Sequence, residues 1–180
     1  MSKGKLYLVP TPLGAGGDQV ISESTLEIIR GLTVFVMEHG KVGRQALKEF
    51  GLKARMQECR FFELNKFTRP DELPEFLEPA LKEGLDVGLM SDAGVPGVAD
   101  PGAEVVMVAH RAGIEVVPLV GPSSILLSLM ASGMNGQRFL FHGYLSAKRP
   151  QLAKDLKSVE RDSRQRKETQ LFIEAPYRND

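Results

Sequence analysis

The sequence has one cysteine, no tryptophan and no surplus of either charge. Its single cysteine, Cys59, excludes an intrachain disulfide framework and any zinc site built from several thiolates, and this scarcity is typical of a reducing compartment such as the cytoplasm. Lys and Arg number 23, as do Asp and Glu, so no overall field favours nucleic acid or an anionic membrane, although a local basic patch is still allowed. Composition therefore favours a cytoplasmic protein and leaves its partner open.

Long hydrophobic runs are also missing. The first ten residues, MSKGKLYLVP, contain a short apolar run that Pro10 ends, too short for a signal peptide or a membrane span. We therefore expect a soluble protein with no membrane partner. A chain of 180 residues is long enough for one α/β domain, or for a domain and part of a second.

Several familiar catalytic motifs are absent as well. The sequence contains neither the GxxxxGK[ST] phosphate loop nor the GxSxG nucleophile elbow. Its three histidines, His39, His110 and His142, lack metal-ligand spacing, so we expect them to be structural or surface residues and expect no metal.

What the sequence does contain is a series of short apolar runs separated by amphipathic stretches. Runs at residues 5–9, 33–37, 86–90 and 114–119, with a weaker one within 60–64, are typical of buried strands in a parallel sheet. Between two of them, apolar side chains at i, i+3, i+4, i+7 and i+8 predict one helix over residues 73–81. Ser24 and Glu27 have the spacing of a capping box at another helix. The alternation predicts an α/β fold, a mostly parallel sheet with flanking helices, over residues 1–118.

The remainder, residues 119–180, is expected to be the start of a second α/β domain that is incomplete. It contains a predicted helix in SILLSLMASG, a strand in RFLFHGYL and a strand in TQLFIEA, and the sequence ends soon after this last strand. Between the two strands, residues 147–167 are rich in Lys and Arg. This segment is interpreted either as a solvated helix or mobile loop, or as an arm that contacts RNA.

The loops that follow the strands carry the strongest functional signal. In an open parallel sheet these loops gather at the carboxyl ends of the strands, where ligands bind. Here they read VPTPLGAGGD, EHGK, SDAGVPGVADPG and VGPSS, and glycine and proline fix their course while letting backbone groups approach a ligand closely. In the third loop Asp92 is interpreted either as a residue that forms an Asx turn or as one that faces a ligand, and we expect the second. Asp100, which precedes Pro101, is expected to cap the next helix.

A dinucleotide site is one interpretation of this edge. Gly14 and Gly16 follow the first strand, and Glu38 ends the second strand where a ribose-binding acid belongs. Gln19 stands where the third glycine of that motif would pack against the strand. An oxidoreductase that uses a dinucleotide is therefore kept as an alternative function.

Taken together, VPTPLGAGGD, SDAGVPGVADPG, VVPLVGPSS, RFLFHGYL and LFIEAPYR resemble, in this order and spacing, the tetrapyrrole methylase superfamily. The resemblance covers nearly the whole chain. It is strongest to the branch that methylates the 2'-oxygen of a cytidine in small-subunit ribosomal RNA. It implies a methyltransferase that uses S-adenosylmethionine, bound between two α/β domains, and commonly a homodimer.

The resemblance also implies site residues. Those expected to bind the cofactor lie in the first, third and fourth loops and in the last strand of the sequence: Leu13, Asp92, Gly94, Val95, Ser123, Ser124, Ile173 and Glu174. Glu38, Arg44 and Arg178 are placed on the side of the substrate. No residue is assigned a catalytic role, since methyl transfer mainly requires alignment of the reacting atoms and exclusion of water.

The sequence departs from the RNA-modifying branch after the second strand. That branch usually has an acidic pair with a threonine and an arginine, whereas this chain reads MEHGKVGRQAL, which keeps Glu38 and Arg44. Three other interpretations therefore stay open beside an RNA methyltransferase: a methyltransferase acting on a tetrapyrrole or other small molecule, the dinucleotide enzyme, and a non-catalytic binding module. The acceptor, the oligomeric state and the activity of this chain are not settled by its sequence.

Overall fold

The computed structural model describes residues 2–14 and 20–175, with the backbone alone at residues 53 and 54. The chain divides into two compact units, Met1–Ser123 and Ser124–Asp180, called here the first and the second unit. The sequence placed a boundary between residues 118 and 119.

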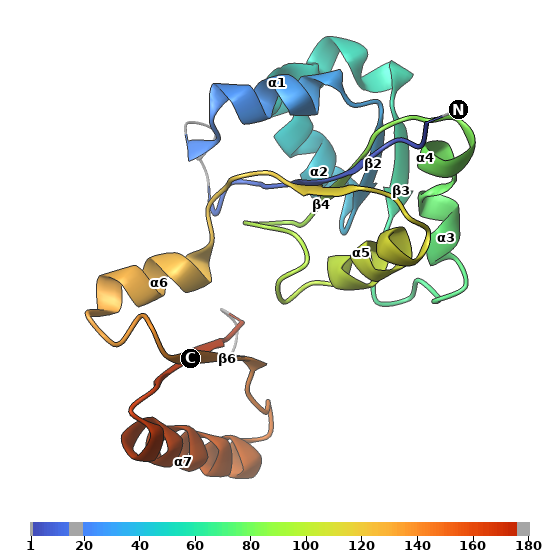
Figure 1. Cartoon of the computed structure of the whole chain (residues 1–180). Coiled ribbons are helices and arrows are strands. Elements are labelled where there is room, and N and C mark those ends of the chain that lie inside the picture. Colours follow the sequence, from blue (N-terminus) through green and yellow to red (C-terminus); the bar gives the residue numbers. More distant parts are fainter. Residues whose placement is uncertain (1, 15–19, 176–180) are drawn as a thin grey trace. The chain divides into compact units, whose positions relative to one another are not determined.

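The first unit is built on a parallel sheet, as predicted. Its five strands have the spatial order β3-β2-β4-β1-β5, and every neighbouring pair is parallel (Figure 1). They are β1 (Leu6–Val9), β2 (Val34–Met37), β3 (Arg60–Glu63), β4 (Val87–Met90) and β5 (Val116–Pro118). Because all five run in one direction, the loops that follow them share one edge.

Helices cover both faces of this sheet. They are α1 (Glu23–Gly31), α2 (Gly40–Leu47), α3 (Leu73–Phe76), α4 (Glu78–Lys82) and α5 (Gly102–Arg111), with a π-helix η2 (Lys48–Leu52) and a 3-10 helix η3 (Lys53–Glu58). Alternate residues of β2 divide between two buried clusters: Val34 and Val36 pack with α3, α4 and α5, and Phe35 and Met37 with α1, α2 and η2. Burial on both faces is the reason that the central strands β2 and β4 are continuously apolar in sequence.

The single helix predicted over residues 73–81 is two short helices, so that prediction was wrong. α3 ends at Phe76 and α4 begins at Glu78. Pro79 has no backbone N–H to donate to the residue four before it, which breaks the helical ladder at this point. The apolar periodicity persists across the break because both helices pack on the same face of the sheet.

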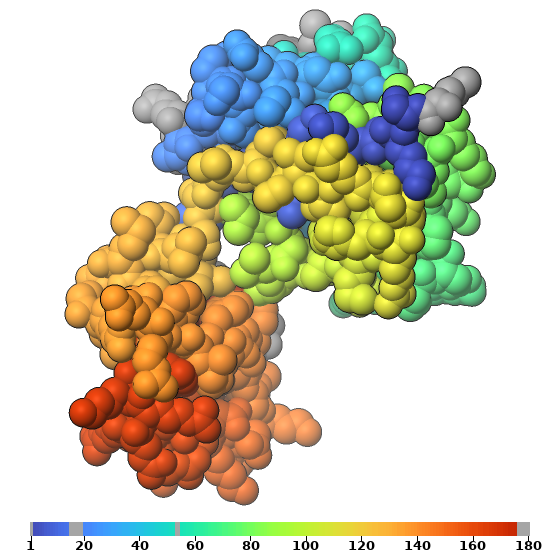
Figure 2. Space-filling model, in the orientation of Figure 1, coloured from blue at the N-terminus to red at the C-terminus, as the bar shows by residue number. Residues whose placement is uncertain are grey.

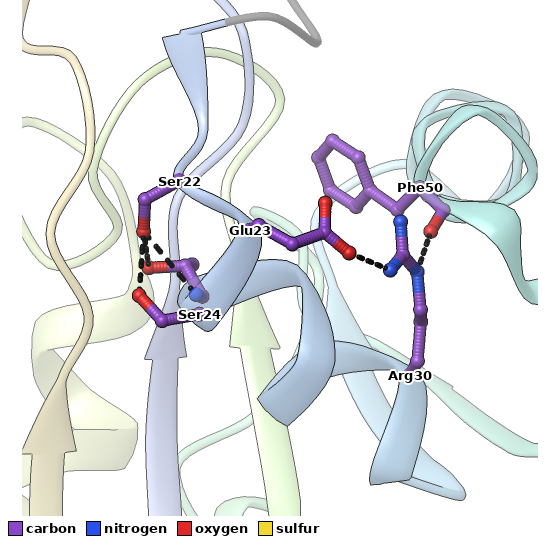
Figure 3. Close-up of polar contacts among 6 residues, drawn as sticks. Ser22, Glu23, Ser24, Arg30 and Phe50 are labelled. Carbon is purple, nitrogen blue, oxygen red and sulfur yellow. Dashed lines mark hydrogen bonds and ion pairs between the residues drawn. The ribbon is translucent and has the colours of Figure 1, made fainter.

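The start of α1 also differs from the prediction. Ser22, not Ser24, is the N-cap, and its hydroxyl accepts a hydrogen bond from the Thr25 N–H at 3.2 Å (Figure 3). The same helix is tied to η2 through Arg30, whose Nε donates to the Phe50 carbonyl at 2.6 Å and whose guanidinium pairs with Glu23. Arg30 therefore fixes α1 against η2.

The N-terminal segment lies beside the segment that leads into β5, on the surface visible in Figure 2. Lys5 forms an ion pair with Glu115 at 3.0 Å, and the Lys3 ammonium donates to the Ala112 carbonyl at 2.6 Å. These contacts tie β1 to the end strand β5.

The second unit contains α6 (Ser124–Ser132), β6 (Phe139–Tyr144), α7 (Arg149–Arg166) and β7 (Thr169–Ile173). β6 and β7 are parallel, starting from the pairing of Phe139 with Thr169, and α7, which connects them, packs against β7 (Figure 1). This is a β-α-β unit: the sequence predicted its two strands, and the segment between them, which it left open as a helix or a loop, is a helix. Within the described ranges, no helix of either unit is long and apolar enough to cross a membrane.

Candidate functional site

The loops after β1 and β4 are joined by their backbones. The Thr11 N–H donates to the Gly94 carbonyl at 2.8 Å, and the Gly94 N–H donates to the Thr11 carbonyl at 3.0 Å. The buried Thr11 hydroxyl donates to the Ser91 and Gly94 carbonyls, each at 3.3 Å. β1 and β4 are parallel neighbours in the sheet, and the loops that follow them are joined by this separate antiparallel bridge.

Gly94 stands where three loops converge. Its φ is +83°, a conformation that glycine adopts far more readily than other residues. A Cβ built at this position would lie 3.2 Å from Leu13 Cδ2 and 3.3 Å from the Pro122 carbonyl oxygen, so residues from the loops after β1 and β5 both press on it. This close packing explains why the third loop has a glycine here.

A cavity of about 520 Å³ opens beside this junction. One wall is formed by residues 11–14 and another by Asp92 and Ala93. The third is formed by α2, through Lys41, Val42, Gln45 and Ala46, and by Glu49 of η2. Its volume lies within the range of about 300–1,000 Å³ that is usual for small-molecule sites. Mainly apolar walls with a few charged groups suit a ligand that has a flat ring and a polar end.

Three titratable side chains meet next to this cavity. His39 Nδ1 and Asp92 Oδ2 are 2.6 Å apart, which joins the loop after β2 to the loop after β4. Glu38, at the end of β2, is partly buried, and burial is the main cause that raises the pKa of its carboxyl above the ordinary value of 4.5. The negative charge of Asp92 raises this pKa further, and His39 opposes the shift.

Glu38, His39 and Asp92 are also the residues here that could hold a metal. One ligand atom from each lies within 4.8 Å of the others, and carboxylates and imidazole are both common ligands of divalent cations. The expectation of a metal-free protein therefore stays a prediction.

Asp100 does not cap α5 in the way predicted. The helix begins at Gly102, so Pro101 occupies the cap position, and the Asp100 carboxylate accepts hydrogen bonds from Gly97 N–H at 2.9 Å and Gly102 N–H at 2.7 Å. Burial raises the pKa of this carboxyl, while the two backbone hydrogen bonds lower it. Asp100 thus fixes the course of the third loop.

The other residues predicted in the first unit lie around the same edge. Leu13 lines the cavity, Val95 is partly buried next to Gly94, and Ser123 follows the β5 loop. The Arg44 guanidinium carbon lies 5.8 Å from the ring centroid of Phe61, over β3, and Arg44 is not among the cavity-lining residues.

In the second unit, Ser124 and Ile173 line a hollow of about 210 Å³ between α6, β6 and β7. Glu174 follows β7, and its carboxylate accepts a hydrogen bond from the Ala175 N–H. Arg178 lies outside the described residues. Contact of any of these residues with a cofactor or substrate stays a prediction.

Sequence reasoning missed Thr11, His39 and the cavity wall from α2. His39 is exposed, as expected of a surface residue, but its pairing with Asp92 was not foreseen, and it arises because β2 and β4 are neighbours in the sheet. A signal existed: His39 directly follows the second apolar run, so it had to lie at the same edge as the Gly-rich loops. Lys41 and Gln45 carry no comparable signal.

An open parallel sheet with Gly-rich loops closing a cavity at its carboxyl edge defines the class of α/β proteins that bind ligands there. The sequence model described as Tetrapyrrole (Corrin/Porphyrin) Methylases matches residues 5–179. This chain belongs to that family, as the resemblance predicted.

Several curated proteins are similar to this chain over nearly its whole length. The chain is 35% identical over 177 residues to ribosomal RNA small subunit methyltransferase I of Escherichia coli O157:H7, and 32% identical over 175 residues to the protein of the same name from Bacillus subtilis strain 168. These alignments cover 98% and 97% of this chain but 58% and 56% of the relatives. The chain therefore spans a little over half the length of these relatives.

The uroporphyrin-III-C-methyltransferase structure from Thermus thermophilus matches with a TM-score of 0.52 and 20% identity, over 78% of this chain and 60% of that one. A conserved hypothetical protein from Aeropyrum pernix K1 matches with a TM-score of 0.56 and 20% identity, over 81% of this chain and 48% of that one. At this identity the likeness concerns the fold alone.

Proposed function

We propose that this chain binds S-adenosylmethionine in the cavity of the first unit and forms part of a methyltransferase that acts on small-subunit ribosomal RNA, at a ribose 2'-oxygen. The observation that carries the proposal is the cavity beside Gly94, at the carboxyl edge of a parallel sheet, in a member of this family. The RNA substrate is supported by the printed names of the relatives.

The residues at this cavity fit the cofactor. Leu13, Val42 and Ala46 offer apolar surface to an adenosine ring. Asp92 supplies a negative charge on the wall that suits the ammonium of an amino acid. When bound, S-adenosylmethionine supplies a methyl group that is activated by its sulfonium.

The protein's own part is to orient the acceptor and to take up the proton that a hydroxyl loses when it is methylated. His39 is our candidate for the proton acceptor. Imidazole changes charge near neutral pH, and when Nδ1 donates its hydrogen to Asp92, Nε2 is left as the accepting nitrogen. A cytoplasmic location and a homodimer belong to the same proposal, and they rest on the single cysteine and on the family resemblance.

The test is calorimetric titration of the 180-residue chain with S-adenosylmethionine, S-adenosylhomocysteine and NAD. We expect the first two to bind and NAD not to bind. Asp92→Ala should weaken binding about tenfold, the equivalent of about 1.4 kcal/mol. Asp71→Ala is the matched control, because Asp71 is exposed and pairs with Arg69 outside the cavity. Binding of NAD alone, or equal effects of the two substitutions, would contradict the proposal.

A further inference from the structure

The outer face of α7 carries a stripe of positive charge. Lys154, Lys157, Arg161 and Arg164 follow one another at i, i+3, i+7 and i+10, which places them within an arc of about 80° around the helix axis. All four are exposed. At about 1.5 Å per residue the stripe is about 15 Å long. Figure 1 shows α7 as one unbroken helix on the β6–β7 pair.

The opposite charges are kept off this stripe. Asp155 and Asp162 lie on the half-buried side of α7, where the Asp155 carboxylate accepts hydrogen bonds from the Ser146 N–H at 3.2 Å and the Gln151 amide at 2.8 Å. Glu160 is the acid that flanks the stripe, and it pairs with Arg164 at 2.7 Å. No acid lies within the arc of the stripe itself, so its four positions present one sign of charge.

Two of the four cations are available without breaking a contact. Within the described residues, neither Lys154 nor Lys157 forms an ion pair or a side-chain hydrogen bond. Arg164 pairs with the exposed Glu160, and such an exposed pair contributes about 0–1 kcal/mol, so a phosphate can compete for this arginine. Arg161 is exposed and pairs with the half-buried Asp162 at 3.4 Å.

We propose that the α7 stripe, Lys154, Lys157, Arg161 and Arg164, binds the phosphate backbone of an RNA strand. A row of cations at near-regular spacing complements a row of phosphates, and contacts of this kind position a nucleic acid without reading its bases. A membrane is disfavoured as the partner, because an interfacial helix needs several large apolar side chains beside its cations, and Leu156 is the one large apolar side chain of Arg149–Arg166 that is exposed.

This inference rests on the proposed function in one respect, that the acceptor is an RNA. It differs in where it places the contact: on the second unit, on a surface that the resemblance did not assign. RNA binding through the stripe would also distinguish the two interpretations of residues 147–167, since a helix that is only solvated would bind no polyanion there.

The test is fluorescence anisotropy of a labelled, single-stranded oligoribonucleotide of mixed sequence with the 180-residue chain, at several salt concentrations. Each phosphate contact contributes about −0.7 to the slope of log K against log salt. Four contacts therefore give about −2.8, and the double variant K154Q/K157Q should give about −1.4. Between about 50 and 200 mM salt, this means an affinity loss of roughly 50-fold for the parent and roughly sevenfold for the variant.

K148Q/K167Q is the matched control. Both lysines are exposed, the same charge is removed, and both positions fall outside the arc of the stripe at the two ends of α7. We expect the control to keep the slope of the parent. An equal loss of slope in the two double variants, or no RNA binding by the parent, would overturn the proposal.

Two further arms separate the possible failures. Vesicles of phosphatidylcholine and phosphatidylserine replace the RNA in a parallel titration, and stripe-dependent binding to them but not to RNA would overturn the proposal in favour of a membrane partner. Titration with S-adenosylmethionine is repeated on both double variants. Unchanged cofactor binding without RNA binding would refute the stripe and leave the cofactor site standing, whereas RNA binding without cofactor binding would do the reverse.

Discussion

The two compact units differ in how completely they bury their apolar residues. In the first unit, strand residues such as Val34 and Phe35 have no exposed surface. In the second unit Phe139, Leu140 and Phe172 expose 41%, 42% and 44%, and α7 has no buried residue in its described length. A unit with a closed core holds its loops in place, so the cavity beside Gly94 is preformed. The second unit is expected to open locally at a lower free energy.

The largest expected effect of this difference is on hydrogen exchange. β1 and β4 each pair with two neighbouring strands, whereas β6 and β7 pair with one another. We expect the amides of Leu8 and Leu89 to exchange roughly 100-fold or more slowly than those of Leu140 and Leu171, because central strands open only with the whole unit. Exchange followed by NMR or mass spectrometry measures this directly, and similar rates in the two sheets would show that the units unfold together.

Truncation of one aromatic residue in each unit sharpens the comparison. Phe35→Ala removes a fully buried ring whose centroid lies 6.0 Å from that of Phe61, and it should lower the free energy of unfolding by about 3–5 kcal/mol. Phe139→Ala, at a partly exposed ring in β6, should cost less than about 1 kcal/mol. Urea denaturation of both variants gives the two values. Equal costs would mean that the second unit has a core of comparable quality.

Within the first unit, alanine substitutions at two glycines can separate the cost of backbone strain from the cost of steric crowding. Gly94 and Gly97 have φ values of +83° and +84°, but a Cβ at Gly97 meets no atom within 4 Å. Replacement by alanine should cost about 1 kcal/mol at either position for the backbone, and about 1 kcal/mol more at Gly94 because Leu13 and Pro122 must move. Thermal unfolding measures the difference. If Gly97→Ala proved the more harmful change, the junction at Gly94 would be looser than described.

The smallest expected effect concerns the carboxyl of Glu38. The folded state raises its pKa above 4.5, so the folded protein keeps this proton to a higher pH than the unfolded chain does. Stability is therefore lost as the pH rises from about 4.5 through the folded pKa, and it stays lower above that range. Glu38→Gln should raise stability at pH 7 by less than about 1 kcal/mol, since the side chain is partly solvated, and change nothing at lower pH. Stabilisation that appears only in acid would contradict this assignment.

Most of the first unit's architecture could be predicted from the sequence. The five apolar runs became the five strands, since burial on both faces leaves a signal that a single sequence contains. The break between α3 and α4 could not be predicted from the apolar pattern, because packing on the sheet sets that pattern and Pro79 breaks the backbone without disturbing it. The N-cap is Ser22 and not the predicted Ser24. Two serines so close together offer the same capping group, so the sequence alone does not decide between them.

The candidate site was only partly predictable for a different reason. The loops were located from glycine and proline, and Gly94 and Asp92 do lie at the edge where they were expected. Which loops touch depends on the order of the strands in space, which local sequence patterns do not encode. Thus the pairing of His39 with Asp92 follows from the position of β2 next to β4, and it became visible only with the fold.

The paired backbone hydrogen bonds between Thr11 and Gly94 have a mechanical consequence. They join the loops after β1 and β4 at one point, so that neither loop can swing outward without the other. Residues on both loops line the cavity, so two of its walls are held together by these backbone hydrogen bonds. The two walls that these loops form therefore move as one piece, and any widening of the cavity on this side requires both loops to move together.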